Sequence, residues 1–255
     1  MKVGIVGVGK VGSAVAFGLA KIGHAILKHD VKLGTSINDV LPAPIIFICV
    51  PTPMLPNGRC ETGIVETVLA QLNVLNYAGL VVIKSTVIPG STDSWYKRYA
   101  LRLAFCPEFL RERSATTDFI ENHDVCIAGV YEQEDADLIR EAHGSLPKVF
   151  TQVRPIEAEL AKYFSNVFNA MRVVFACQFH DVCEALGVNY TNVKSAVVCR
   201  HNIGDYYLDC NALLRSFGGA CLPKDTEAFA NLVMDLGVDA PLFKAIVNFN
   251  ERLSK

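Results

Sequence analysis

The stretch KVGIVGVGKVG, residues 2–12, decides the fold of this chain. It opens with a short apolar run typical of a β-strand and passes directly into glycines spaced as GxGxxG. An amphipathic pattern from Ser13 to Lys21 then predicts a helix, and a second apolar run, Ala25–Lys28, predicts a strand that leads to Asp30. This order, with an acid 18 residues after the last glycine, is the pattern of a dinucleotide-binding βαβ unit. The alternative interpretation is a glycine-rich turn that binds no ligand.

The three glycines have separate roles in binding a pyrophosphate. Gly7 allows the tight turn, Gly9 lets the backbone approach the phosphates, and Gly12 lets the helix pack close to the strand. Asp30 would accept hydrogen bonds from the adenosine ribose hydroxyls and repel a 2′-phosphate, so we predict NAD rather than NADP as the cofactor. Further cofactor contacts are expected from Val8, Lys10, Val11, Lys32, Val50, Pro51, Thr52, Ser85, Thr86, Glu112 and Lys224.

Short apolar segments bounded by Pro, Gly or polar turns alternate with helical patterns along residues 45–151. The expected strands are Ile45–Val50, Leu80–Lys84, Arg102–Cys106, Asp124–Ala128 and Lys148–Thr151, and the expected helices are Gly63–Leu75, Thr92–Tyr99 and Gln133–His143. Buried strands that alternate with helices predict an α/β fold, with a Rossmann-type doubly wound parallel sheet. Its functional loops should lie at the carboxyl ends of the strands, in residues 50–53, 84–87 and 106–110.

The pattern changes near residue 155 and becomes helical. Residues 156–186 form one long helical pattern, and shorter patterns follow at Thr191–Cys199 and Glu227–Leu253. A helix of this length often forms a domain spine or a dimer interface, and its broad apolar face predicts an obligate homodimer. We therefore predict two domains, a dinucleotide-binding domain at residues 1–153 and an all-helical domain at residues 154–255.

The composition excludes several classes of protein. The chain has 255 residues, of which 51% are hydrophobic and 20% are charged, so it can bury a core and is not disordered. The net charge of −2 argues against a general binder of nucleic acid or anionic membranes. Without a signal-peptide pattern or an apolar run of membrane-spanning length, we expect a cytoplasmic protein. The nine cysteines include no Cys-x-x-Cys pair, so we expect free thiols and no metal.

Residues 217–226, FGGACLPKDT, are the strongest chemical signal. Cys221 lies just before a predicted helix start and close to Lys224, and both features favour the thiolate form. The alternative is a buried structural cysteine. With GIVGVGKVG, VPTP, KSTVIPGST, CPEFLRERSATTDF and EAELAKYFSNVFNAMRVVFA in the same order, this loop resembles the successive motifs of the UDP-glucose/GDP-mannose dehydrogenase family. The resemblance runs from the first strand to about Asn250.

The resemblance implies an enzyme that oxidises the C6 alcohol of a nucleotide sugar to a carboxylate with two NAD. It makes Cys221 the nucleophile that forms a thiohemiacetal and then a thioester. It assigns Lys162 and Asn166, four residues apart on one helix face, to the oxyanion and the substrate hydroxyl. Glu108 is similar to the carboxylate that activates the hydrolytic water, with Thr86 and Asp225 positioning it. The expected substrate contacts are Glu108, Phe109, Leu110, Arg111, Glu112, Lys162, Asn166, Tyr207, Leu208, Phe217 and Gly218.

The sequence departs from the family pattern in three places. Only about 15 residues separate Asp30 from Ile45, so a helical element is expected to be missing or shortened there. Between Leu208 and the FGG motif, the segment DCNALLRS is longer than the family's loop. The chain stops at NFNERLSK, where full-length members continue into a third domain that covers the nucleotide. A natural minimal form or a separate chain that supplies this domain would both account for that end.

The residues leave the substrate open. The resemblance favours UDP-glucose, which would be converted to UDP-glucuronate, whereas residues 202–204 with Tyr206 and Tyr207 resemble the GDP-mannose branch. UDP-N-acetylmannosamine is a further alternative. A non-catalytic homologue that binds NAD or a sugar nucleotide would not need Cys221, and neither would a two-electron hydroxyacid dehydrogenase of the same fold.

Overall fold

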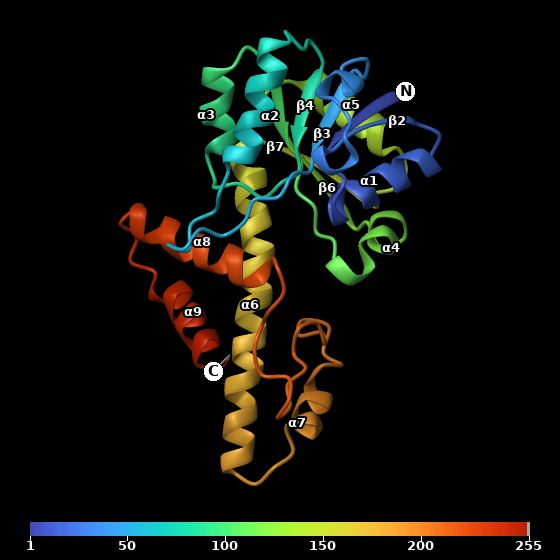
Figure 1. The fold of residues 1–255 in the computed structure, drawn as a ribbon. Helices are drawn as coiled ribbons and strands as arrows, with labels where there is room; N and C mark the ends of the chain where they lie inside the picture. The colour runs from blue at the N-terminus through green and yellow to red at the C-terminus, as the bar shows by residue number, and fades with distance from the viewer. Residues whose placement is uncertain (254–255) are drawn as a thin grey trace. The chain divides into compact units, whose positions relative to one another are not determined.

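The computed structural model describes residues 1–253 and divides into two compact units. The first unit comprises residues 1–53 and 61–162, and the second comprises residues 54–60 and the described residues from 163 onward. Helix α6 (Pro155–Ala185), drawn in yellow and orange in Figure 1, begins in the first unit and continues into the second.

The first unit is built on a seven-stranded sheet with the order β2-β1-β3-β4-β5-β6-β7. The strands are β1 (Lys2–Val6), β2 (Ala25–His29), β3 (Ile45–Ile48), β4 (Leu80–Ile83), β5 (Arg102–Phe105), β6 (Val125–Gly129) and β7 (Val149–Val153). The helices of this unit are α1 (Lys10–Lys21), α2 (Gly63–Val74), α3 (Ser91–Arg98), α4 (Ala115–Ile120) and α5 (Gln133–His143), followed by the start of α6. The predicted α/β, doubly wound Rossmann fold is confirmed.

Alternating side chains of the strands form one apolar core on each face of the sheet. Along β3, Ile45 and Phe47 face one core, whereas Ile46 and Ile48 face the other. The first core is covered by α1, α4 and α5, and the second by α2, α3 and the first turn of α6, as the ribbon shows (Figure 1). Because both faces are covered, the central strands read as continuous hydrophobic runs.

The sheet is not parallel throughout, which corrects the sequence prediction. Strands β1 to β5 are parallel to one another, and β6 is parallel to β7. Strands β5 and β6 are antiparallel and share a single paired position, Phe105↔Gly129. The unpredicted helix α4 packs on α1, where the ring of Phe119 lies against Gly18, and does not return the chain along β5. The last residue of β6 lies beside the last residue of β5, and the two strands run in opposite directions.

The expected shortening after Asp30 is confirmed. Between β2 and β3 the chain forms only two short 3₁₀ turns, η1 (Val31–Leu33) and η2 (Ile37–Val40). The second turn carries a capping box, in which the Ser36 side chain accepts from the turn and Asp39 accepts from the Ser36 backbone.

The second unit is helical and consists of the rest of α6 with α7 (Tyr190–Val197), α8 (Leu222–Asp235) and α9 (Pro241–Leu253). The single helical pattern expected over Glu227–Leu253 is wrong, because two helices occupy it. Gly237 adopts a left-handed φ of 66° after α8, and Pro241 begins α9.

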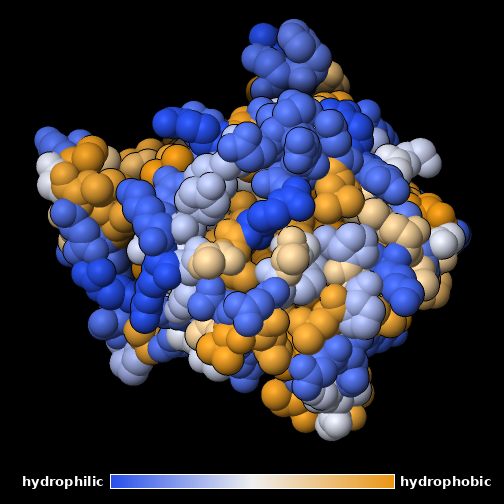
Figure 2. Space-filling model, turned by 90° about the horizontal axis from the view of Figure 1, so that it is seen from above, coloured by the Kyte–Doolittle hydropathy of each residue, from blue (hydrophilic) through white to orange (hydrophobic). Residues whose placement is uncertain are grey.

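Hydrophobic residues on the outer surface lie in patches between hydrophilic ones on the face that Figure 2 shows. Among residues 1–253, no helix is both long enough and apolar enough to span a bilayer.

Candidate active site

The glycine-rich turn between β1 and α1 is closely packed at two of its glycines. Gly7 has a φ of 87°, and a Cβ there would lie 2.8 Å from the backbone of Cys49. A Cβ on Gly12 would lie 1.9 Å from the carbonyl oxygen of Gly7. Gly9 precedes the first turn of α1, and a Cβ there would meet nothing within 4 Å. The turn is therefore closely packed at Gly7 and Gly12 and open at Gly9. This arrangement fits a pyrophosphate at the N-terminus of α1.

Asp30 lies at the end of β2 and contacts this turn directly. Its carboxylate accepts hydrogen bonds from the backbone N–H of Val8, at 2.7 Å, and of Lys32, at 2.8 Å. These two bonds lower the pKa of Asp30, so the carboxylate stays charged. The sequence predicts that Asp30 binds a ribose, and the structure shows that Asp30 holds the glycine-rich turn through Val8.

The other expected cofactor residues of this unit come from neighbouring strand ends. Val50, Pro51 and Thr52 follow β3, whereas Ser85 and Thr86 follow β4, and the hydroxyl of Ser85 donates to the carbonyl of Val50 at 2.6 Å. Because β3 and β4 are parallel neighbours, both loops lie at one edge of the sheet. Val8 lies in the turn, Lys10 and Val11 begin α1, Lys32 lies in η1 and Glu112 begins η3 (Glu112–Ser114), whereas Lys224 belongs to the second unit.

Glu108 is buried and held by two lysines. Its carboxylate forms an ion pair with Lys84, the residue directly after β4. Its backbone carbonyl accepts a hydrogen bond from Lys162 Nζ at 2.6 Å. Burial alone would lower the pKa of Lys84, but the neighbouring Cys106 and Glu108 raise it above its usual range. Lys84 is thus a charged partner of Glu108 that we did not single out from the sequence, although a lysine ending the apolar run LVVI was a visible signal.

The segment after Glu108 is more exposed. Phe109 and Leu110 are half-buried, and the Lys162 ammonium lies 5.4 Å from the ring centroid of Phe109. The Arg111 guanidinium pairs with Asp118, whose pKa is held well below its usual range by that contact. A substrate at this segment would therefore meet an Arg111 already tied to its own unit.

In the second unit, Cys221 occupies the N-cap of α8 and is exposed. One turn into the helix, Asp225 is 1% exposed and accepts hydrogen bonds from Asn166 Nδ2 and Lys224 Nζ, both at 2.5 Å. Asn166 lies on α6, one turn after Lys162. The structure thus brings Asn166 of α6 together with Lys224 and Asp225 in the first turn of α8, the helix for which Cys221 is the N-cap.

The exposure of Cys221 distinguishes it from most other thiols. Seven cysteines are buried or half-buried, and burial raises the pKa of Cys49 and Cys177 to about 12. Cys199 is the other exposed thiol, but it follows the C-terminal end of α7. Cys221 is therefore the exposed thiol that lies at the N-terminus of a helix.

Two expected substrate contacts have buried side chains. Leu208 and Phe217 pack into the two cores of the helical unit. The Asn250 side chain bonds both the N–H and the carbonyl of Phe217, at 2.8 and 3.0 Å. Tyr207, in contrast, is exposed and has a left-handed φ of 60°, and Gly218 is exposed. The buried side chains of Leu208 and Phe217 are thus core residues, and the backbone N–H and carbonyl of Phe217 are already bonded to Asn250.

The chain matches known proteins over most of its length. Two models of the UDP-glucose/GDP-mannose dehydrogenase family match it, the NAD binding domain at residues 29–146 and the central domain at residues 156–252. It is 33% identical over 223 residues to the UDP-glucose 6-dehydrogenase of Rickettsia typhi, covering 84% of this chain and 50% of the relative. It is 29% identical over 228 residues to the GDP-mannose 6-dehydrogenase of Pseudomonas aeruginosa, covering 83% and 51%. The chain spans about half the length of these curated relatives.

The fold matches a solved structure as well. A UDP-glucose dehydrogenase from the hyperthermophilic archaeon Pyrobaculum islandicum superposes with a TM-score of 0.89 at 28% identity, over 98% of this chain and 68% of that one. The two family models match residues on either side of the start of α6, from residue 29 in the sheet unit to the helices of the second unit. The chain therefore belongs to the UDP-glucose/GDP-mannose dehydrogenase family and carries its NAD binding domain and its central domain.

Proposed function

We propose that this chain oxidises the C6 alcohol of a nucleotide sugar to a carboxylate, with NAD as the cofactor and Cys221 as the nucleophile. The observation that carries the proposal is the exposed Cys221 thiol at the N-cap of α8, beside a buried Asp225 that holds Asn166 and Lys224. A protein that only binds NAD or a sugar nucleotide has no use for this arrangement. The family membership of the chain supports the same reaction class.

The chemistry requires a covalent intermediate because four electrons leave one carbon. When bound, NAD accepts each hydride. In the first oxidation C6 loses a hydride and its hydroxyl loses a proton to water, which gives an aldehyde. The Cys221 thiolate adds to this aldehyde, and uptake of a proton by the oxygen gives a thiohemiacetal. Loss of a hydride from that carbon and of the hydroxyl proton then gives a thioester. Water then attacks the thioester carbon, the C–S bond breaks, and the carboxylate leaves with the thiol regenerated.

We assign separate roles to the polar residues that would contact the oxyanion, the hydrolytic water and the cofactor. Asn166 donates one amide hydrogen to Asp225, which fixes the orientation of the amide and leaves its second hydrogen for a developing oxyanion. We assign Lys162 to the same oxyanion and the Glu108 carboxylate to activation of the water, with Thr86 and Asp225 as positioning residues. For the cofactor, Gly7, Gly9 and Gly12 would hold the pyrophosphate and Asp30 the ribose.

UDP-glucose is the substrate we propose, with UDP-glucuronate as the product. The relatives at 33% and 29% identity carry the names UDP-glucose and GDP-mannose 6-dehydrogenase, so both sugars belong in the test, together with UDP-N-acetylmannosamine. A panel of these sugar nucleotides, with NADH counted per product, should give two NADH per carboxylate for the true substrate.

The decisive variants change Cys221. Cys221→Ala should reduce turnover at least 1000-fold, because no thiohemiacetal can form. Cys221→Ser keeps a nucleophile with a much poorer leaving group, so the sugar should stay attached as an ester. Mass spectrometry of the peptide spanning residues 217–224 would detect that adduct.

The matched control is Cys199→Ala, which removes the exposed thiol that follows the C-terminal end of α7. This variant should leave turnover unchanged. If Cys221→Ala kept most of the parent activity, a two-electron dehydrogenase would be the better assignment. If the parent bound NAD yet formed no NADH with any sugar nucleotide, the chain would be a non-catalytic homologue.

A further inference from the structure

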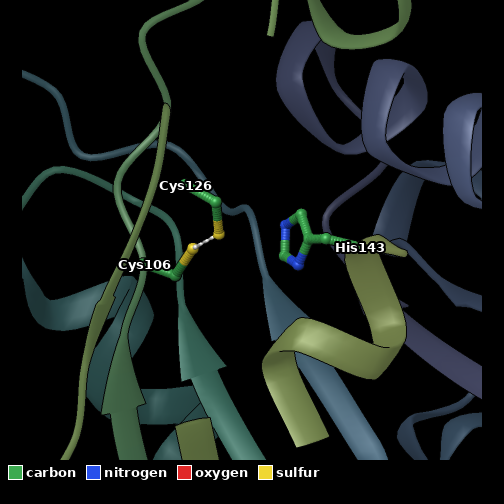
Figure 3. Close-up of side chains that lie close together, drawn as sticks. All are labelled: Cys106, Cys126 and His143. Carbon is green, nitrogen blue, oxygen red and sulfur yellow. Dashed lines mark hydrogen bonds between the residues drawn. The ribbon is translucent and has the colours of Figure 1, made fainter. Parts of the chain in front are cut away.

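Three side chains of the first unit with metal-binding donors meet in the interior of the sheet. Cys106 follows β5, Cys126 lies on β6, and His143 is the last residue of α5. The two sulfurs are 3.6 Å apart, and all three donor atoms lie within 4.8 Å of one another (Figure 3). Each residue is at most 1% exposed. These residues have no role in the proposed oxidation.

The imidazole of His143 is oriented for a ligand. Its Nδ1 pairs with the backbone carbonyl of Ile139 at 2.9 Å, so Nδ1 carries the proton and Nε2 presents a lone pair. Within residues 1–253, Nε2 is buried and no hydrogen bond of ordinary geometry reaches it, although the imidazole interacts with the Cys106 thiol. Figure 3 shows a ring nitrogen of His143 facing the two sulfurs. A metal ion bound by the nitrogen and both sulfurs would take the place of the thiol protons at this point.

We propose that Cys106, Cys126 and His143 bind a zinc ion. Thiolate and imidazole are the donors that zinc prefers. A tetrahedral zinc with Zn–S bonds of about 2.3 Å holds two sulfurs roughly 3.8 Å apart, close to the 3.6 Å observed here. A backbone carbonyl on the far nitrogen of the imidazole is the usual support of a ligating histidine, and Ile139 supplies it.

His123 is the candidate for the fourth ligand. Its ring centroid is 5.8 Å from that of His143, and its Nδ1 is also buried without a hydrogen-bond partner among the described residues. Phe119 packs against both imidazoles, and Phe47 packs against His143, so aromatic rings cover the imidazole side of the cluster. Rotation of His123 would complete a Cys₂His₂ set.

The charges around the cluster favour a divalent ion. Lys84 and Glu108 form a buried ion pair that is neutral as a whole, and Lys84 Nζ lies 3.4 Å from Cys106 Sγ. Two thiolates with Zn²⁺ keep the cluster neutral, whereas two thiolates with a monovalent copper would leave one uncompensated negative charge in the interior.

The position of the cluster suggests what the metal does. Strands β5 and β6 share only one paired position, yet they supply one cysteine each. A zinc ion would link these strands to the end of α5 and close this seam of the sheet. The proposed role is structural, and it does not depend on the proposed oxidation.

Metal content of the full chain tests the proposal. After removal of metal with a chelator and reloading with Zn²⁺, the parent should retain about one zinc per chain and unfold at a higher temperature than the metal-free protein. Loading with Co²⁺ alone should give the visible absorption of a tetrahedral site and the ultraviolet band of a cobalt–thiolate bond. Both readouts use the unchanged protein, so they hold even if a variant does not fold.

Variants assign the ligands. Cys126→Val and His143→Phe should each lower retained zinc at least 10-fold and abolish the cobalt–thiolate spectrum. The matched control is Cys210→Val, because Cys210 and Cys177 form another buried pair with sulfurs 3.6 Å apart, with which no third metal-binding donor groups among residues 1–253. Zinc retention that is unchanged in Cys126→Val would overturn the assignment. So would a parent chain that binds no zinc, or one in which Cys106 and Cys126 are joined as a disulfide. A parent that holds zinc but lacks dehydrogenase activity would support this site and remove only the proposed function.

Discussion

Asp30 combines a structural role with the cofactor role that its position predicts. Both of its carboxylate oxygens accept backbone N–H bonds, one from Val8 in the glycine-rich turn and one from Lys32. Each carboxylate oxygen can accept a further hydrogen bond, so a ribose hydroxyl can be added without loss of these contacts. The same residue therefore shapes the turn and can select the cofactor.

We expect Asp30→Ala to weaken NAD binding by about 10- to 100-fold, because it removes charged hydrogen bonds both to the ribose and to the turn. NADP should be weakened less, since the variant also removes the repulsion of its 2′-phosphate. Isothermal titration calorimetry with both cofactors measures this difference.

Asp39→Ala is the control for this measurement, because Asp39 is an exposed acid that caps η2 in the same connection and touches no part of the turn. It should leave both affinities within about twofold. Parent protein that bound NADP at least as tightly as NAD would show that the ribose assignment of Asp30 is wrong.

At the scale of single elements, α6 supports the N-terminus of α3. The Glu159 carboxylate of α6 is 0% exposed and accepts from the backbone N–H of Gly90 and Thr92 and from the Thr92 hydroxyl. Gly90 is the N-cap of α3, with a φ of 94°. One buried carboxylate thus replaces the local cap that an eight-residue helix lacks.

Burial raises the pKa of Glu159 to about 7, against the lowering effect of its bonds from Thr92 and Gly90, compared with 4.5 for an ordinary glutamate. A carboxyl whose pKa is raised on folding binds its proton more tightly in the native state, so stability falls as pH rises from about 4.5 to about 7. We expect the stability of the parent relative to Glu159→Gln to fall by about 3 kcal/mol over that range. Urea unfolding at pH values between these limits measures it.

Glu157→Gln is the control on the same helix, because Glu157 is expected to change the free energy of unfolding with pH in the opposite direction. The Arg154 backbone N–H and guanidinium lower the pKa of the exposed Glu157, so its small contribution is present at neutral pH and is lost as pH falls. A Glu159→Gln variant whose stability followed that of the parent at every pH would contradict the raised pKa of Glu159.

At the scale of the whole molecule, α6 carries an exposed apolar surface. We call it the α6 stripe, and it consists of Phe164, Phe168, Phe175, Phe179 and Val182. At 100° per residue these side chains lie within roughly 60° of one another around the helix. The spacing of four and seven residues is typical of a helix that packs against another helix. A second copy of this chain, packed through the same stripe, would bury it.

We therefore expect the parent to be a dimer at micromolar concentration and Phe168→Asp/Phe175→Asp to be a monomer. Each aromatic side chain contributes about 1.5–3 kcal/mol when buried, so the double variant should weaken association at least 100-fold. Analytical ultracentrifugation measures both proteins.

The control is Phe17→Asp, which changes an exposed phenylalanine of α1 outside the stripe and should leave the dimer intact. A parent that sediments as a monomer across the micromolar range would remove the dimer proposal. Dimerisation that survives the double variant would place the interface on another surface.

The sequence alone determined the features that local patterns encode. Glycine spacing, strand length and the position of Asp30 specify a βαβ unit within about 30 consecutive residues, so the α/β fold and NAD were predictable. The long helix was predictable from its apolar periodicity, with the first residue placed within one position. The prediction that Cys221 is a nucleophile depended mainly on the resemblance of its loop, because a helix start and a nearby Lys224 alone also fit a structural cysteine.

Tertiary structure decided what depends on strand order and on contacts between distant residues. The antiparallel direction of β6 relative to β5 depends on the path of the chain between them, which no local pattern reports. The contact between Asn166 and Asp225 joins residues 59 apart in the chain, and that between Cys106 and Cys126 joins residues 20 apart. Sequence spacing could not pair these side chains, because the path of the chain between them sets the distance. Only the assembled sheet brought two cysteines and an imidazole to one buried point.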